Sequence, residues 1–243
     1  MKRFKLDLIL PCFNPLTGWE QIVAVKVDQI RRSFPDSTIH VIIVNDGTSN
    51  GNWDTGSAFL ETKLKDITLI SNLENRGKGA ALRAGVSSSN SELCVFTDID
   101  FPYTEDSLRG MIMLLHERED IQICIGQRAD DYYAHVPLIR TLISKTFRGF
   151  LKLIYGFPFR DTQCGLKAFK SEARELFLET KTNRYLIDLE FLLEASKRKL
   201  SILPVQVELR NGVSFSRLST IALVREAQSV VSILFRVLIG GAQ

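Results

Sequence analysis

Asp98 and Asp100 stand one residue apart, directly after the apolar run of residues 93–96. Such a run is typical of a buried strand, and polar residues that follow it lie at the carboxyl edge of a sheet, where α/β proteins bind ligands. Two hard oxygen ligands suit Mg²⁺ or Mn²⁺, which proteins usually hold with one or two carboxylates and substrate phosphates. The spacing predicts a metal-bound nucleotide or nucleotide-sugar, although a solvated turn would show the same pattern.

Two further segments combine turn residues with groups that bind nucleotides. Asp46 follows the apolar run 39–44 and could accept hydrogen bonds from a base or a ribose, or belong to a turn without a ligand. The glycine-rich segment 75–85 opens a predicted helix whose first turn carries Arg76 and Lys78. Because cations oppose the dipole at a helix N-terminus, a bound phosphate would explain them. Tight packing of the small residues on a sheet is the alternative.

Asp188 is a carboxylate in apolar surroundings, since its neighbours are Ile187 and Leu189. Exposure to solvent therefore does not explain it. A buried carboxylate needs a partner and often has a shifted pKa at a functional site. A helix cap or an ion pair is the structural alternative, and for a reaction with a hydroxyl acceptor Asp188 would be the candidate base.

The elements that must position these residues alternate between strands and helices in the first half of the chain. Strands are predicted at residues 6–10, 39–44, 67–70, 93–96 and 121–125. Helices are predicted at 17–33, 53–65, 76–88 and 104–119, the last capped by Thr104. In the second half we expect helices at 137–155, 169–178 and 185–198, a strand at 200–209, and a helix from 219 or 220 to 239. This order predicts an α/β fold with a mostly parallel, Rossmann-like sheet flanked by helices.

Composition limits the classes of function. The 243 residues, 45% hydrophobic and 24% charged, suit one large α/β domain or two small ones. A net charge of +3 does not argue for nucleic acid as a partner, but it is compatible with an anionic substrate or membrane surface. Four scattered cysteines indicate buried free thiols in a reducing compartment, not a zinc site. We expect no signal peptide and no conventional membrane-spanning helix.

Several of these segments follow one another in a recognisable order. The first four are residues 10–14, 44–47, 75–79 and 98–100. In this order they resemble the inverting family 2 glycosyltransferases of the GT-A fold. The later segments are residues 126–128, Arg140 with Ser144, and residues 161–167, 188–190 and 210–219. They are similar to the polyprenyl-phosphate branch, which holds the dolichol-phosphate mannosyltransferases and dolichyl-phosphate β-glucosyltransferases. The resemblance covers roughly residues 5–225.

The resemblance implies roles for particular residues. The nucleotide-sugar would contact Pro11, Asn14, Asp46, Lys78, Asp98, Arg210 and Arg217. A metal, Mg²⁺ or Mn²⁺, would be held by Asp98 and Asp100. The residues implied in catalysis are Asp100, Arg128, Arg140 and Asp188, with the two arginines on the acceptor phosphate. The chain departs from the family at Asn45, Pro102 and Arg217, and its Asp-Thr-Gln-Cys-Gly-Leu-Lys stretch at 161–167 is more similar to the glucosyl type.

The expected organisation is a GT-A domain at 1–217 and a C-terminal amphipathic helix at 218–243. The apolar surface of that helix predicts contact with a membrane interface, a membrane-protein partner or a dimer, whereas packing on its own core is the alternative. The basic segment 137–155 favours an anionic lipid surface.

We therefore expect transfer of a hexose from UDP-glucose or GDP-mannose to a polyprenyl or dolichyl phosphate. The expected location is the cytoplasmic face of a membrane, as a peripheral protein, without nucleic acid. The alternatives are a soluble glycosyltransferase with a hydroxyl acceptor, a nucleotidyltransferase and a subunit without catalytic activity.

Overall fold

The structure is a computed structural model that describes residues 2–128 and 161–211. The strands are β1 (Lys5–Cys12), β2 (Thr38–Asp46), β3 (Ile67–Asn72), β4 (Leu93–Phe96), β5 (Ile123–Arg128), β6 (Lys167–Lys170) and β7 (Ile202–Val207). The α-helices are α1 (Trp19–Ser33), α2 (Asn52–Lys63), α3 (Lys78–Ser87), α4 (Glu105–Glu117), α6 (Arg174–Glu179) and α7 (Ile187–Lys197), and a 3₁₀ turn, Ser171–Ala173, precedes α6.

These strands form one sheet in the order β3-β2-β1-β4-β6-β5-β7. Neighbouring strands are parallel except at β6, which runs antiparallel to both β4 and β5. Because β1 lies between β2 and β4, the strand order reverses at this point, and the loops after β1, β2, β3 and β4 leave the sheet at one edge. We call it the carboxyl edge, and a reversal of this kind is where open α/β sheets bind ligands.

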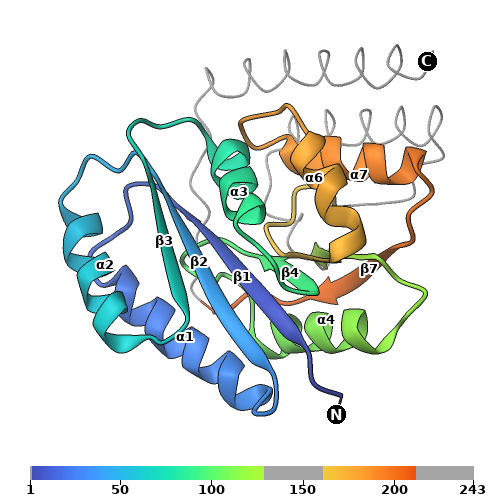
Figure 1. Cartoon of the computed structure of the whole chain (residues 1–243), viewed down its shortest axis with the longest axis horizontal. Coiled ribbons are helices and arrows are strands. Elements are labelled where there is room, and N and C mark those ends of the chain that lie inside the picture. The colour runs from blue at the N-terminus through green and yellow to red at the C-terminus, as the bar shows by residue number, and fades with distance from the viewer. Residues whose placement is uncertain (1, 129–160, 212–243) are drawn as a thin grey trace.

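Helices cover both faces of the sheet (Figure 1): α1, α2 and α4 lie on one face and α3, α6 and α7 on the other. Adjacent residues of a strand point to opposite faces, so Leu8 belongs to the first core and Ile9 to the second. Burial on both faces explains why the central strands are continuous apolar runs in the sequence.

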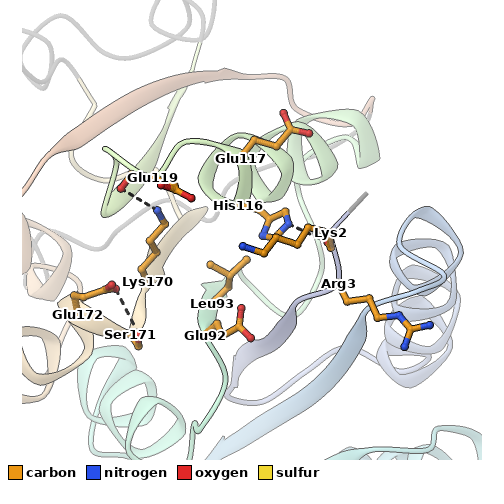
Figure 2. Close-up of a pocket in the computed structure, with 10 residues that line it drawn as sticks. All are labelled: Lys2, Arg3, Glu92, Leu93, His116, Glu117, Glu119, Lys170, Ser171 and Glu172. Atoms are coloured by element: carbon orange, nitrogen blue, oxygen red, sulfur yellow. Dashed lines mark hydrogen bonds between the residues drawn. The ribbon is translucent and has the colours of Figure 1, made fainter.

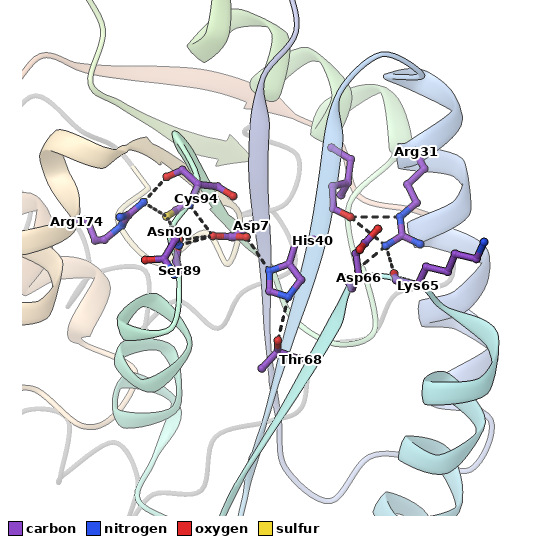
Figure 3. A network of polar contacts seen from close by, with 12 residues as sticks. Asp7, Arg31, His40, Lys65, Asp66, Thr68, Ser89, Asn90, Cys94 and Arg174 are labelled. Atoms are coloured by element: carbon purple, nitrogen blue, oxygen red, sulfur yellow. Dashed lines mark hydrogen bonds and ion pairs between the residues drawn. The ribbon is translucent and has the colours of Figure 1, made fainter.

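A buried polar network fastens the first strand to its neighbours (Figure 3). Asp7 Oδ1 lies 2.9 Å from His40 Nδ1 on β2, and Asp7 Oδ2 accepts hydrogen bonds from Ser89 Oγ at 2.6 Å, Asn90 N at 2.9 Å and Ser91 N at 3.0 Å. Burial alone would raise the pKa of the Asp7 carboxyl, but these hydrogen bonds outweigh it and leave the pKa lowered. A fully bonded carboxylate of this kind stabilises the fold.

Most of the predicted elements are confirmed, but one prediction is wrong. The segment 169–178 is not a helix from its start, because residues 167–170 form β6 and the α-helix begins only at Arg174. A four-residue strand is too short to show a periodicity of its own. The segment 137–155, the helix predicted from 219 or 220, and the domain boundary at 217 lie outside the described residues.

Three smaller predictions can also be compared with the structure. Thr104 caps α4, and its side chain accepts a hydrogen bond from Ser107 N. All four cysteines are free and buried. Within residues 2–128 and 161–211, none of the helices has the length and apolar character needed to cross a bilayer.

Candidate active site at the carboxyl edge

The turn that follows β4 carries the two predicted metal ligands, Asp98 and Asp100. Phe101 has a positive φ of 47°, and its N–H donates to Asp98 O at 2.9 Å, which closes the turn. Arg210 donates through Nε to Phe101 O at 2.5 Å and through Nη2 to Asp100 O. The predicted phosphate contact Arg210 is thus placed beside the acidic turn, where its guanidinium binds main-chain oxygens.

The carboxylates of this turn concentrate negative charge. Burial, followed by the nearby charge of Asp98, raises the pKa of Asp100. The Asp98 side chain is 35% exposed and forms an ion pair with Lys78 Nζ. Two neighbouring carboxylates, one of them accessible, fit a divalent cation. No cluster of three or more His, Cys, Asp or Glu side chains with metal-binding geometry occurs in the described part of the chain. A metal here would therefore need ligands from substrate phosphates or water as well.

Asp46, at the end of β2, accepts hydrogen bonds from two main-chain N–H groups and one side chain of the protein. It is 2% exposed, and it accepts hydrogen bonds from Gly77 N at 2.7 Å, Arg76 N at 2.9 Å and Asn72 Nδ2 at 3.1 Å. Gly77 has φ 100°, and a Cβ at this position would lie 2.3 Å from Asn183 O, so only glycine fits this turn. Asp46 shapes the turn before α3, and its contact with a nucleoside stays a prediction.

The N-terminus of α3 is capped by the protein itself. Gly79 N and Ala80 N donate to Asn183 O, at 2.8 and 3.2 Å. These two N–H groups therefore already have a main-chain acceptor, and a phosphate beside Arg76 and Lys78 stays a prediction. The structure supports the alternative, tight packing of the small residues on the sheet, since a Cβ on Gly85 would stand 2.5 Å from Ile9 Cγ2. Lys78 is the first residue of α3, and its ammonium forms an ion pair with the carboxylate of Asp98.

The loops after β1 and β2 are tied together by Asn14. Its N–H donates to Thr48 Oγ1 at 3.1 Å, and its Oδ1 accepts from Ser49 N at 3.0 Å. Pro11 lies within β1, opposite Val44 of β2. The predicted donor residues of the first half of the chain thus lie at one edge of the sheet, although they come from β1, β2, α3 and the loops after β1 and β4.

Arg128, predicted to bind an acceptor phosphate, forms a bidentate ion pair at the end of β5. Its Nε and Nη2 donate to the two carboxylate oxygens of Asp161 at 2.7 and 2.8 Å, and both side chains are nearly buried. Burial would raise the pKa of Asp161, but the hydrogen bonds and charge of Arg128 leave it lowered. Its role toward a phosphate stays a prediction, and Arg140 and Arg217 lie outside the described residues.

Lys167 is a charged residue of this region that sequence reasoning did not select. Its side chain is fully buried, its Nζ donates to Cys164 O at 2.6 Å, and it lies 2.8 Å from Asp188 Oδ1, off the hydrogen-bond direction. The structural alternative for Asp188, an ion pair, is therefore confirmed. A lysine inside the apolar stretch Gly-Leu-Lys-Ala-Phe at 165–169 was the available signal, because lysine is almost never fully buried without a partner.

A surface pocket exists elsewhere, at the opposite edge of the sheet (Figure 2). It lies beside the first residue of β4 and the end of α4. It is lined by Lys2, Arg3, Glu92, Leu93, His116, Glu117, Glu119, Lys170, Ser171 and Glu172. None of the predicted site residues lines it, so the candidate site is the carboxyl edge.

Comparison with known families identifies the class of protein. The family model described as Glycosyl transferase family 2 matches residues 7–176. The chain therefore belongs to glycosyl transferase family 2, and it is a glycosyltransferase with a GT-A fold, as the order of its motifs predicts.

Among curated proteins, the chain is similar to proteins named dolichyl-phosphate beta-glucosyltransferase. That of Drosophila melanogaster is 29% identical over 84% of this chain and 66% of its own length. That of Dictyostelium discoideum is 28% identical over 97% of this chain and 75% of its own. A Trichomonas vaginalis protein of this name is 30% identical over 93% of this chain and 69% of its own length. The chain thus spans just under two thirds of the Drosophila relative.

Solved structures share the fold at low sequence identity. Mannosyl-3-phosphoglycerate synthase from Rubrobacter xylanophilus superposes with a TM-score of 0.71 at 15% identity, over 98% of this chain and 75% of that one. A second neighbour is glucosyl-3-phosphoglycerate synthase from Mycobacterium tuberculosis, in complex with Mn²⁺, UDP and glucosyl-3-phosphoglycerate. It superposes with a TM-score of 0.63 at 15% identity, over 96% of this chain and 80% of that one.

Proposed function

We propose that the chain transfers a hexose, glucose from UDP-glucose in preference to mannose from GDP-mannose, to a polyprenyl or dolichyl phosphate with inversion. Asp98 and Asp100 would hold Mg²⁺ or Mn²⁺, which supplies charge stabilisation for the leaving diphosphate. Pro11, Asn14, Asp46 and Lys78 are proposed to form the donor site, from the ends of β1 and β2, the loop after β1 and the start of α3.

The acidic turn is the observation that carries this proposal. Asp98 and Asp100 follow β4 at the point where the strand order reverses. The Asp98 carboxylate is accessible and forms an ion pair with the ammonium of Lys78. The relatives named dolichyl-phosphate beta-glucosyltransferase support the glucosyl donor and the lipid-phosphate acceptor. The structural neighbour from Mycobacterium tuberculosis, which is in complex with Mn²⁺ and UDP, supports the choice of metal and nucleotide.

A phosphate acceptor agrees with the surroundings of Asp188. A phosphate monoester is already anionic at neutral pH and needs positioning by cations more than it needs a base. A hydroxyl acceptor would need a base within hydrogen-bond reach. The Asp188 side chain is 4% exposed and paired with Lys167, which supports the phosphate acceptor over the hydroxyl alternative.

Exposed apolar side chains support contact with a lipid surface at the same edge. Phe13 is 49% exposed and Leu16 85% exposed on the loop after β1, and Leu73 is fully exposed on the loop after β3. Large exposed apolar side chains on loops at the edge that carries a ligand site agree with membrane or partner contact. We propose peripheral attachment to the cytoplasmic face of a membrane, with segments 137–155 and 218–243 as further contacts, directly or through a membrane-protein partner.

Calorimetric titration of UDP and of GDP, first with Mn²⁺ and then with EDTA, tests the donor site. We expect metal-dependent binding of UDP, weaker binding of GDP, and transfer of glucose from UDP-glucose to dolichyl phosphate. Asp100→Asn should abolish transfer while the melting temperature is kept. If neither nucleotide binds in the presence of metal, the proposed function is wrong.

A further inference from the structure

The segment 208–210, which directly follows β7, is paired with the residues that follow the acidic turn. Tyr103 and Leu209 form an antiparallel bridge between the two segments. On either side of this bridge the main chains are joined by a hydrogen bond of 2.9 Å, one from Thr104 N to Glu208 O and one from Arg210 N to Pro102 O. Two segments far apart in the sequence are therefore held together beside the candidate metal site.

The Arg210 side chain extends this pairing to the acidic turn itself. Its Nε donates to Phe101 O at 2.5 Å, and its Nη2 donates to Asp100 O. One edge of the planar guanidinium therefore holds two consecutive carbonyl oxygens, and one of them belongs to a proposed metal ligand. Because both acceptors are main-chain atoms, Arg210 is placed to fix the course of the turn.

The backbone of Phe101 shows why the turn needs such support. Its φ of 47° lies in the left-handed region, which is unfavourable for a residue with a bulky side chain. Conformations of this kind persist where the surroundings hold them on several sides, and they cluster at functional sites. Phe101 is buried in the core, its N–H donates to Asp98 O, and its carbonyl oxygen accepts from Arg210. Arg210 thus supplies one of the constraints that keep the turn in this conformation.

We propose that Arg210 is a positioning residue of the metal site, which acts through the main chain of the acidic turn. Its guanidinium fixes the backbone from which the carboxylates of Asp98 and Asp100 project, and the pairing of segment 208–210 fixes Arg210. The inference rests on the proposed function, because it takes these two carboxylates as the metal ligands. It differs from a direct contact between Arg210 and a substrate phosphate, for which any cation at this place would be sufficient.

Arg210→Lys separates the two roles, because lysine keeps the positive charge but lacks the planar pair of donors. Hydrogen exchange of the nucleotide-free chain, measured by mass spectrometry over residues 97–104, reports on the turn. The Mn²⁺ concentration needed for half-maximal binding of UDP in calorimetry, here called the Mn²⁺ requirement, reports on the metal ligands. We expect faster exchange and a higher Mn²⁺ requirement, each by at least about tenfold, the loss expected for one hydrogen bond to a charged group. Arg210→Met should change both quantities at least as much.

Arg31→Lys is the matched control, because the guanidinium of Arg31 also holds main-chain oxygens but does so away from the candidate site (Figure 3). It donates to Ile39 O through Nε at 3.3 Å and through Nη2 at 3.0 Å, and Nη2 also donates to Lys65 O. Arg31→Lys should leave the exchange of residues 97–104 and the Mn²⁺ requirement unchanged. Arg210→Lys keeps the main-chain pairing of segment 208–210, so it should fold even if Arg210→Met does not, and melting temperatures check this.

Unchanged exchange and an unchanged Mn²⁺ requirement in the Arg210 variants would overturn the inference. A change in only one of these quantities would overturn it too, because the effect on the metal must come through the turn. UDP binding that is weakened in Arg210→Met but normal in Arg210→Lys would make Arg210 a phosphate contact instead. If the wild-type chain binds UDP with Mn²⁺ and one of these results is found, only this inference fails. If the wild-type chain binds neither UDP nor GDP, the proposed function fails and takes the inference with it.

Discussion

Gly165 is the residue whose replacement should damage the site with the least damage to the fold. It lies between β5 and β6, and a Cβ built on it would stand 2.4 Å from Asp98 Oδ2. Its backbone does not have a positive φ, so alanine fits the main chain without strain. Its N–H donates to Tyr103 Oη at 2.8 Å, and alanine keeps this hydrogen bond. The effect of Gly165→Ala should therefore come only from the steric clash between the added Cβ and the Asp98 carboxylate.

The expected size follows from the distances. Ordinary contact with a Cβ begins at 3.4 Å, so an oxygen that would stand 2.4 Å away must move by about 1 Å. A displacement of about 1 Å in a catalytic group costs on the order of 100-fold in rate. We therefore expect Gly165→Ala to lower kcat/KM for glucosyl transfer about 100-fold and to weaken Mn²⁺-dependent binding of UDP, with the melting temperature close to that of the wild type.

Gly110→Ala is the control for this experiment. Gly110 lies inside α4, and a Cβ there would meet no atom within 4 Å. Alanine is favoured over glycine in a helix by up to about 1 kcal/mol, so this variant should be slightly more stable and fully active. Activity of Gly165→Ala within threefold of the wild type would refute the reasoning, because it would show that Asp98 can move without loss of function.

Three other predictions concern the residues that support the site. Asp46→Ala leaves the N–H groups of the turn before α3 without their acceptor, so the free energy of unfolding in urea should fall by about 2 to 4 kcal/mol; a loss below 1 kcal/mol would contradict this. The pKa of Asp161 is lowered in the folded chain, so its contribution to stability is present above its usual pKa of 3.8 and is lost as the pH falls through the folded value. Wild-type stability should therefore fall more steeply below pH 3.8 than that of Asp161→Asn in acid unfolding, and parallel curves would refute the role of the pair with Arg128. Burial raises the pKa of the Cys12 and Cys124 thiols to about 12, so a maleimide should not label them in the native chain at neutral pH, as mass spectrometry would show; rapid labelling before unfolding would contradict their burial.

The parts of the site that follow strands could be predicted from the sequence. Asp98 and Asp46 each come two residues after the end of a continuous apolar run, and the edge of the sheet on which such residues gather follows from the alternation of strands and helices. Local pattern and chain order were sufficient for these positions, because the crossovers between β1, β2, β3 and β4 leave these four strands parallel.

Contacts between distant segments could not be predicted. Nothing near Gly79 in the sequence indicates that Asn183, about a hundred residues later, caps α3 by accepting a hydrogen bond from Gly79 N in its first turn. Lys167 shows the same difficulty, because its burial depends on a partner on α7 and on the position of β6. A four-residue antiparallel strand is defined by its neighbours, and its own residues, with a lysine at each end, give no such signal.

The position of β6 also constrains when the protein can fold during synthesis. Residues 93–96 of β4 are made early, but the strand that covers their free edge consists of residues 167–170. Until that later segment leaves the ribosome, β4 presents unpaired N–H and C=O groups that invite pairing with other chains. Premature termination after Arg128 would leave a sheet with this edge open, so we expect such fragments to aggregate and to need chaperones.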